Sequence, residues 1–238
     1  MKKYILLFLM SLAFFLISSL PASLFVSSIQ SQSPYLNFTT VEGSIWQGHA
    51  NSPKLGKIDW DFSPLALLQA KLGWQIQIEQ EAQYVLVFNL SVDVFKQLQL
   101  SEVAGTLSSI ALKNFKLLPD NVFSVSSFEV QIDELNIDWD AGNLAARPDL
   151  LQGLLQVKNL NVLGEQLGDY QLRIDSKDQQ LNGVFTEKKA QIKANLNVTL
   201  SLSNQLKIEG DIKANNKEMQ SLLNSANVKD KVLFNYQL

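Results

Sequence analysis

The 238-residue chain has 46% hydrophobic and 18% charged residues and a formal net charge of −3 at pH 7. This composition excludes a wholly disordered chain, and with only two arginines, Arg147 and Arg173, it offers no basic patch of the kind that binds nucleic acid. Cysteine is absent and His49 is the only histidine, which excludes disulfides, thiol catalysis, zinc–thiolate sites and most histidine-based active sites.

An uncharged run near the N-terminus indicates a membrane segment. Lys2 and Lys3 precede residues 4–29, which carry no charge. About 17–25 apolar residues are enough to span a bilayer, so this run suits an uncleaved transmembrane anchor. A cleaved signal peptide is the alternative, although Leu20 occupies a position that cleavage sites usually give to a small residue. We expect the anchor.

The anchor determines the expected organisation of the chain. The two lysines keep residues 1–3 in the cytoplasm, because basic residues favour that side of the membrane. No linker rich in Pro or Gly divides residues 30–238. We therefore expect one periplasmic domain over residues 30–238, held at the bacterial inner membrane by residues 4–29.

Alternation of apolar and polar residues dominates this domain. It occurs in Gln75–Glu79, in residues 123–139, in Ile192–Leu202 and in Leu206–Ala214. The second run slips by one residue at Asp133-Glu134, which predicts a β-bulge. A period of two gives each strand one apolar and one polar face, which is typical of antiparallel sheets.

Turn-forming pairs are expected to separate the strands. They are Gly164-Glu165, Gly168-Asp169, Asn182-Gly183 and Ser203-Asn204. The last seven residues, Val232–Leu238, again favour a strand.

Three segments have helical character. In the first, Ser63 is placed to cap Leu65–Ala70, and Pro64 suits the first helical position because its missing N–H costs nothing there. The others are Arg147–Gln156 and Lys217–Leu223. The predicted fold class is therefore all-β: an N-terminal transmembrane helix, then an antiparallel β-rich domain with two or three short helices.

The apolar face of such a sheet needs a cover. In Ile192–Leu202 alone, six apolar residues share one face. A second sheet would close that face into a sandwich, which is the common solution and the one that we expect. A curved or folded half-pipe with an open apolar groove is the alternative.

No catalytic set emerges from the motifs near residue 45. Gly43 and Gly48 have the spacing of a phosphate-binding loop, but His49-Ala50 stands where such a loop needs Lys followed by Ser or Thr. Two tight turns beside a strand that buries Trp46 explain the glycines better. His49 has no identifiable partner for acid–base work.

Two pairs of aspartates have a structural explanation. Asp59 and Asp61 flank Trp60, and Asp138 and Asp140 flank Trp139. Residues two apart on a strand share the solvent face, so each tryptophan points inward. We predict no enzymatic activity, no cofactor and no metal site, and we expect Trp46 and Trp60 to anchor the core.

Residues 41–74 resemble the type II secretion system protein N family, also called general secretion pathway protein N (GspN). The resemblance rests on a glycine–tryptophan–glycine stretch followed by Trp, Pro and a Leu-Leu step, here Gly43, Trp46, Gly48, Trp60, Pro64, Leu67 and Leu68. It implies an accessory inner-membrane component of a bacterial type II secretion system, and it implies structural roles for these residues.

The resemblance also implies the partners. These are the other inner-membrane and periplasmic subunits of the secretion system, and the function is support for the export of folded proteins across the outer membrane. The alternative is a lipid-handling periplasmic β protein of the AsmA-like kind, because long amphipathic strands without catalytic groups also suit a sheet that holds acyl chains. Lipid is then a second possible ligand.

Overall fold

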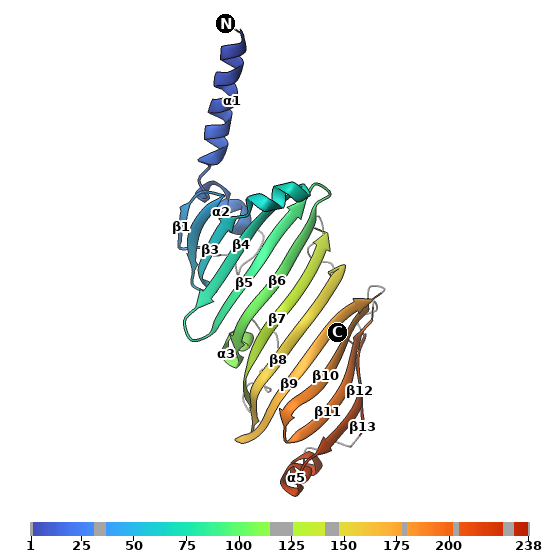
Figure 1. The fold of residues 1–238 in the computed structure, drawn as a ribbon. Coiled ribbons are helices and arrows are strands. Elements are labelled where there is room, and N and C mark those ends of the chain that lie inside the picture. The colour runs from blue at the N-terminus through green and yellow to red at the C-terminus, as the bar shows by residue number, and fades with distance from the viewer. Residues whose placement is uncertain are drawn as a thin grey trace.

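The computed structural model describes residues 2–30, 37–114, 126–140, 148–177, 180–201, 205–225 and 231–237. Its body is one antiparallel sheet of 13 strands, which lie side by side in the order of the sequence (Figure 1). The strands are β1 (Thr40–Gly43), β2 (Gln47–Ser52), β3 (Gly56–Phe62), β4 (Lys71–Gln80), β5 (Tyr84–Asp93), β6 (Gln97–Ser108), β7 (Ser126–Asp140), β8 (Leu150–Val162), β9 (Glu165–Lys177), β10 (Gln180–Ala190), β11 (Ile192–Leu200), β12 (Gln205–Ala214) and β13 (Lys231–Gln237).

Helices occupy the N-terminus and a few connections. They are α1 (Lys2–Ser18), α2 (Ser23–Gln30), the 3₁₀-helix η1 (Pro64–Gln69), α3 (Ser109–Asn114) and α5 (Lys217–Ser225). In Figure 1, α1 projects from the end of the sheet that is formed by β1 to β4.

The prediction of one helical span over residues 4–29 is wrong, because the helix breaks around Pro21. α1 ends at Ser18 and α2 begins at Ser23. Proline lacks an amide hydrogen and disfavours the helical conformation of the residue before it, which explains the break. Within the described ranges, no helix combines the length and the hydrophobicity needed to cross a membrane.

The predicted all-β, antiparallel architecture is confirmed. Gln75–Glu79 lies in β4, and the two later alternating runs form β11 and β12. β13 confirms the terminal strand. The predicted bulge is also present, since the pairing of β7 with β8 shifts between Ile132 and Asn136. Residues 123–125 and 202 of the alternating runs lie outside the described residues.

The turn predictions succeed only in part. Gly164-Glu165 does lie at the turn between β8 and β9, but Gly168-Asp169 lies inside β9 and Asn182-Gly183 inside β10. Gly183 pairs with Ile174 on one side and Val198 on the other. Two backbone ladders thus outweigh the local turn preference of an Asn-Gly pair. Ser203-Asn204 lies outside the described residues.

The helix predictions also have a mixed outcome. α5 confirms the helix at Lys217–Leu223, and η1 confirms helical structure after Pro64, although Ser63 makes no side-chain cap bond. The helix over Arg147–Gln156 is wrong: its described part from Leu150 onward belongs to β8, which pairs with both β7 and β9. α3 was not predicted.

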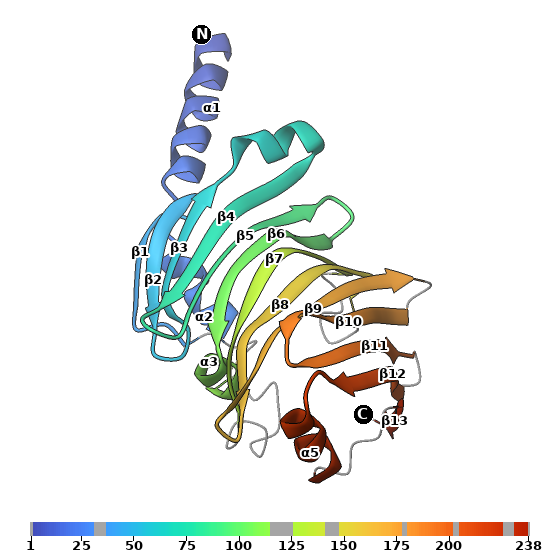
Figure 2. The same cartoon turned by 60° about the horizontal axis from the view of Figure 1, so that its bottom comes forward.

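The expected sandwich is wrong, because all 13 strands belong to one sheet. The sheet coils, and Figure 2 shows it arching over α2, α3 and α5. The strand registers place apolar residues of neighbouring strands on the same face of the sheet. Examples are the pairs Ile76–Phe88, Leu86–Gly105 and Val198–Ile208. In the described residues short helices pack against parts of this face, and no second sheet covers it.

Two small buried clusters show how the helices do this. Ala111 of α3 is fully buried against Tyr84 and Leu107. Met219 and Leu223 of α5 pack with Tyr170, Ile192 and other residues of β9 to β11. The Tyr170 ring stacks on Phe185, with 5.2 Å between ring centroids, and its hydroxyl donates to the carbonyl oxygen of Ile192 at 3.1 Å.

Tyr170 predicts a loss of stability at high pH. Burial, reinforced by the Glu187 carboxylate, raises the pKa of Tyr170 from 10.0 to about 12. Between these values the unfolded chain loses the phenol proton while the folded chain keeps it, so stability must fall as pH rises. We expect the melting temperature to fall less steeply over this pH interval in Tyr170→Phe. Equal slopes for the wild type and the variant would contradict the assignment.

Candidate functional site at the junction of the N-terminal helices and the sheet

The link between α1 and α2 is bonded to the turn that joins β1 and β2. Pro21 forms an isolated antiparallel bridge with Ser44. The amide of Ala22 donates to the carbonyl oxygen of Gly43 at 3.1 Å, and the amide of Ile45 donates to that of Leu20 at 3.0 Å. The N-terminal helices are therefore tied to the sheet by the backbone itself.

Three tryptophans support this junction. Each indole Nε1 donates to a backbone carbonyl oxygen at 2.9 Å: Trp46 to Ile17, Trp60 to Ser44 and Trp74 to Ile45. One bond thus reaches α1 and two hold the β1–β2 turn. Each such bond contributes about 1 kcal/mol in a typical protein.

Phe62 packs between two of these rings. Its centroid is 4.7 Å from that of Trp46 and 5.8 Å from that of Trp74, both in edge-to-face geometry. The backbone follows the same arrangement, because the amide of Phe62 donates to the carbonyl oxygen of Trp46 at 2.6 Å. Aromatic pairs of this kind add about 0.5–1.5 kcal/mol beyond the area that they bury.

Gly43 and Gly48 are glycines for two different reasons. Gly43 has φ +94°, in the left-handed region that favours glycine. Gly48 lies beneath the Trp60 ring, and a Cβ there would collide with both the Trp60 indole and the carbonyl oxygen of Glu42.

Gly48→Ala is accordingly expected to destabilise the protein by roughly 1–3 kcal/mol, because the added methyl overpacks the site. Gly183→Ala is the matched control. Gly183 is another strand glycine, and the one tight contact of its added methyl would be the end of the flexible Leu172 side chain, at 3.0 Å, while the Arg173 carbonyl oxygen and Val198 Cβ lie at ordinary contact distances of 3.5 and 3.7 Å. Urea unfolding of the full chain in detergent measures both variants. Similar midpoints for the two would contradict the proposed contact between Gly48 and Trp60.

Pro64 and Leu68 are not part of the junction. Both lie in η1, which follows β3, and Leu68 is 84% exposed. The sequence-predicted residues therefore divide into two groups. Gly43, Trp46, Gly48 and Trp60 come together, whereas Pro64 and Leu68 lie on a separate helix.

An apolar groove lies beside the junction. It has a volume of about 570 Å³, and its walls are Ala22, Val26, Phe38, Val41, Ile45, Trp46, Ala50, Ile58, Trp60, Leu72, Trp74, Ile76 and Leu90. Trp46 and Trp60 were expected to anchor the core. Both are half-buried, and both form part of the groove wall. In the part of the chain that the structure describes, no second layer covers the sheet at this point.

The polar residues near the junction lie on the face of the sheet opposite to the groove. His49 pairs with Glu42 and Asp59 across its two neighbouring strands, and His49 Nε2 is 3.5 Å from Glu42 Oε2. Lys57 Nζ is 2.8 Å from Asp59 Oδ2. The described residues contain no group of three or more His, Cys, Asp or Glu that could hold a metal ion.

Sequence reasoning missed Trp74 and the contribution of α2. Ala22 and Val26 line the groove, but the predicted membrane span had absorbed them. Two signals were available. Pro21 interrupts the apolar run, which predicts a helix break, and Trp74 shares the period of two with Ile76.

The comparisons with known proteins identify the family. The model for the type II secretion system (T2SS), protein N, matches residues 34–230. The chain belongs to this family. The match confirms the resemblance found at residues 41–74. By family membership, the protein is a component of a type II secretion system. Protein N is not a known enzyme family. No curated protein and no solved structure matches the chain significantly.

Proposed function

We propose that the protein is an accessory component of a bacterial type II secretion system that supports the export of folded proteins across the outer membrane. The family match over residues 34–230 carries this proposal. In this proposal residues 30–238 form one domain on the periplasmic side of the inner membrane.

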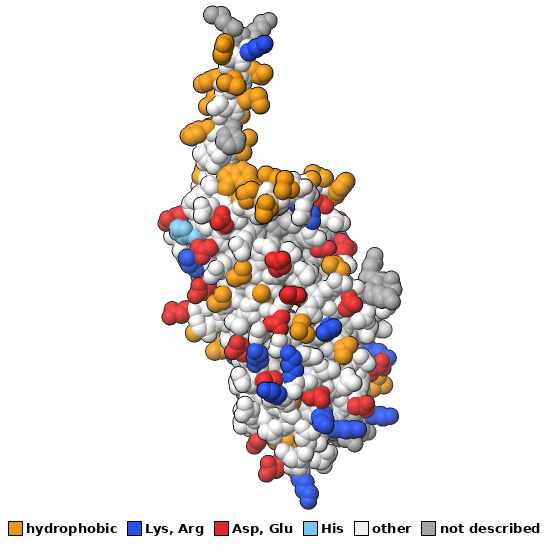
Figure 3. Space-filling model, in the orientation of Figure 1, with side chains coloured by type: hydrophobic (Ala, Val, Ile, Leu, Met, Phe, Trp, Pro, Cys, Tyr) orange, Lys and Arg blue, Asp and Glu red, His pale blue; other side chains and the backbone are white. Residues whose placement is uncertain are grey.

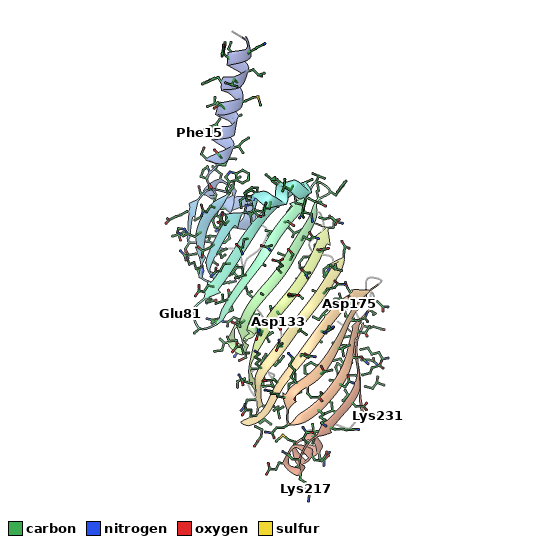
Figure 4. The ribbon with its side chains drawn as sticks, viewed as in Figure 1. Phe15, Glu81, Asp133, Asp175, Lys217 and Lys231 are labelled. Carbon is green, nitrogen blue, oxygen red and sulfur yellow. The ribbon has the colours of Figure 1, made fainter. Side chains whose placement is uncertain are left out.

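Attachment to the inner membrane occurs through α1. The described apolar side chains of α1 are exposed: Tyr4 is 78% exposed and Leu7 70%. Burying such side chains in lipid gains roughly 25 cal/mol per Å² of apolar surface. Figure 4 shows Phe15 on α1, clear of the sheet. In this proposal Gly43, Trp46, Gly48 and Trp60 have a structural role, since they hold α1 at a fixed place on the sheet.

The edges of the sheet are the proposed contacts for other subunits. β1 and β13 are the edge strands, and an edge strand can accept a strand from a partner through backbone hydrogen bonds. β1 is the favoured edge, because the junction holds it close to the membrane where the other inner-membrane subunits lie.

Secretion by a deletion strain tests this function. We expect the secretion of folded substrates to fall on deletion and to recover with the wild-type gene, while the same substrates accumulate in the periplasm. A strain that lacks an essential subunit of the apparatus provides the lower limit. Export that is unchanged by deletion would contradict a required role.

The apolar groove favours lipid handling as a second candidate function. Its volume of about 570 Å³ is within the range of small-molecule sites, roughly 300–1,000 Å³. Its wall consists of aliphatic and aromatic residues throughout, which suits an acyl chain rather than a polar ligand.

A photoactivatable fatty acid in vesicles that contain the full chain tests this candidate. We expect cross-links to peptides from β3 and β4. Ala22→Trp should fill the groove and remove them, whereas Ala82→Trp, at an exposed turn position outside the groove, should not. Cross-links that are absent, or that are indifferent to Ala22→Trp, would exclude the groove as an acyl site.

A further inference from the structure

Exposed apolar side chains gather at the end of the molecule from which α1 leaves. On η1, Leu65 is 72% and Leu68 84% exposed, and Leu67 is exposed as well. In the turn between β5 and β6, Val94 is 74% and Phe95 83% exposed. Together we call these five residues the apolar rim.

The strand register brings the two parts of the rim together. Lys71, the first residue of β4, pairs with Asp93, the last residue of β5. The turn at residues 94–96 therefore lies beside the end of η1. Figure 3 shows the hydrophobic side chains at this end as a group at the foot of α1, and in Figure 4 Glu81 marks the opposite end of β4.

The backbone holds the rim in place. The amide of Ser63 donates to the carbonyl oxygen of Gly73 at 2.8 Å, which fixes the start of η1 on β4, and that of Ala70 donates to Leu67 at 3.0 Å. In the turn, one carboxylate oxygen of Asp93 accepts from the amides of Phe95 and Gln97, both at 2.8 Å. The exposed side chains are thus presented by ordered structure.

The chemistry of the rim suits the interface of a bilayer. Leucine and phenylalanine form its tip, and Lys96 follows Phe95 in the turn. A lysine beside apolar residues can place its ammonium group among lipid headgroups while the apolar side chains enter the acyl region. The rim is continuous with the place where α1 leaves the sheet, so lipid would meet both.

We propose that the apolar rim is a second membrane contact, which enters the interfacial region of the same bilayer that holds α1. The proposal rests on the attachment through α1 proposed above. In this orientation of the sheet, the ends of β3 to β6 that lie next to η1 face the membrane. Leu72, which is 46% exposed and lines the groove, then places the mouth of the groove at the lipid surface.

Single cysteine probes test this proposal, because the chain has no cysteine of its own. The full chain is placed in vesicles of phosphatidylethanolamine and phosphatidylglycerol. A fluorophore is attached at Leu68→Cys or Phe95→Cys in the rim, at Leu9→Cys in α1, or at Leu163→Cys. Leu163 is the matched control, since it is 71% exposed but lies in the turn between β8 and β9, at the other end of the strands.

We expect nitroxide lipids to quench the rim probes several-fold more than the Leu163→Cys probe, and aqueous iodide to quench them less. Rim probes that behave like Leu163→Cys while Leu9→Cys is shielded would overturn the rim contact and leave the attachment standing. Exposure of Leu9→Cys to iodide would overturn both. Rim probes that are exposed in vesicles but shielded in native envelope membranes would identify the rim as a protein contact instead.

Discussion

Ala111→Asp is expected to lower the free energy of unfolding by roughly 3–5 kcal/mol, because it places a carboxylate without a partner charge in a buried apolar site. Ala111 is 0% exposed and packs against Tyr84 and Leu107. The substitution therefore tests whether α3 covers the apolar face of the sheet. Urea unfolding of the full chain in detergent, followed by circular dichroism, measures the change.

The neighbouring residue supplies the control. Ile110 belongs to the same helix and is exposed. Ile110→Asp introduces the same charge one position away, and we expect a change within about 0.5 kcal/mol. Equal losses for the two variants would mean that α3 does not pack on the sheet as described.

Trp60→Ala is expected to destabilise the protein by roughly 2–4 kcal/mol. A fully buried tryptophan costs about 3–5 kcal/mol when cut to alanine, and half-burial lowers that value. The loss includes the hydrogen bond from Nε1 to the carbonyl oxygen of Ser44. Trp60→Phe keeps an aromatic ring but lacks this donor. The lost hydrogen bond should lower the free energy of unfolding by about 1 kcal/mol, in addition to the effect of the smaller ring.

Phe95→Ala serves as the control for Trp60→Ala, since it also removes a large aromatic side chain but from an exposed turn. We expect little change in its unfolding midpoint in detergent. A Trp60→Ala variant as stable as Phe95→Ala would show that the indole contributes nothing to the junction.

The strands were predictable because their signal is local. In β11 and β12 every second side chain faces the core, and this period is visible in the residues alone. The number of layers was not predictable, because an apolar strand face looks the same whether a second sheet or a short helix covers it. The turns predicted at Gly168 and Gly183 do not form for a related reason: the conformation of these residues is decided by pairing with neighbouring strands.

The candidate site shows the same limit. The glycine and tryptophan motif was recognisable, and its structural role was expected. What could not be foreseen is that Gly48 lies under Trp60 from the next strand, or that Trp74 bonds to Ile45, 29 residues earlier in the chain. Such contacts depend on the register of the sheet and on the break at Pro21, which returns α2 to the groove.

The glycine and tryptophan motif fixes α1 relative to the sheet. A pulsed dipolar measurement between spin labels at Leu12→Cys on α1 and Gln77→Cys on the outer face of β4 tests it in the full chain in vesicles. We predict one narrow distance distribution, which broadens in Trp46→Ala because that variant loses the bond to Ile17. A distribution that is already broad with Trp46 in place would contradict the claim.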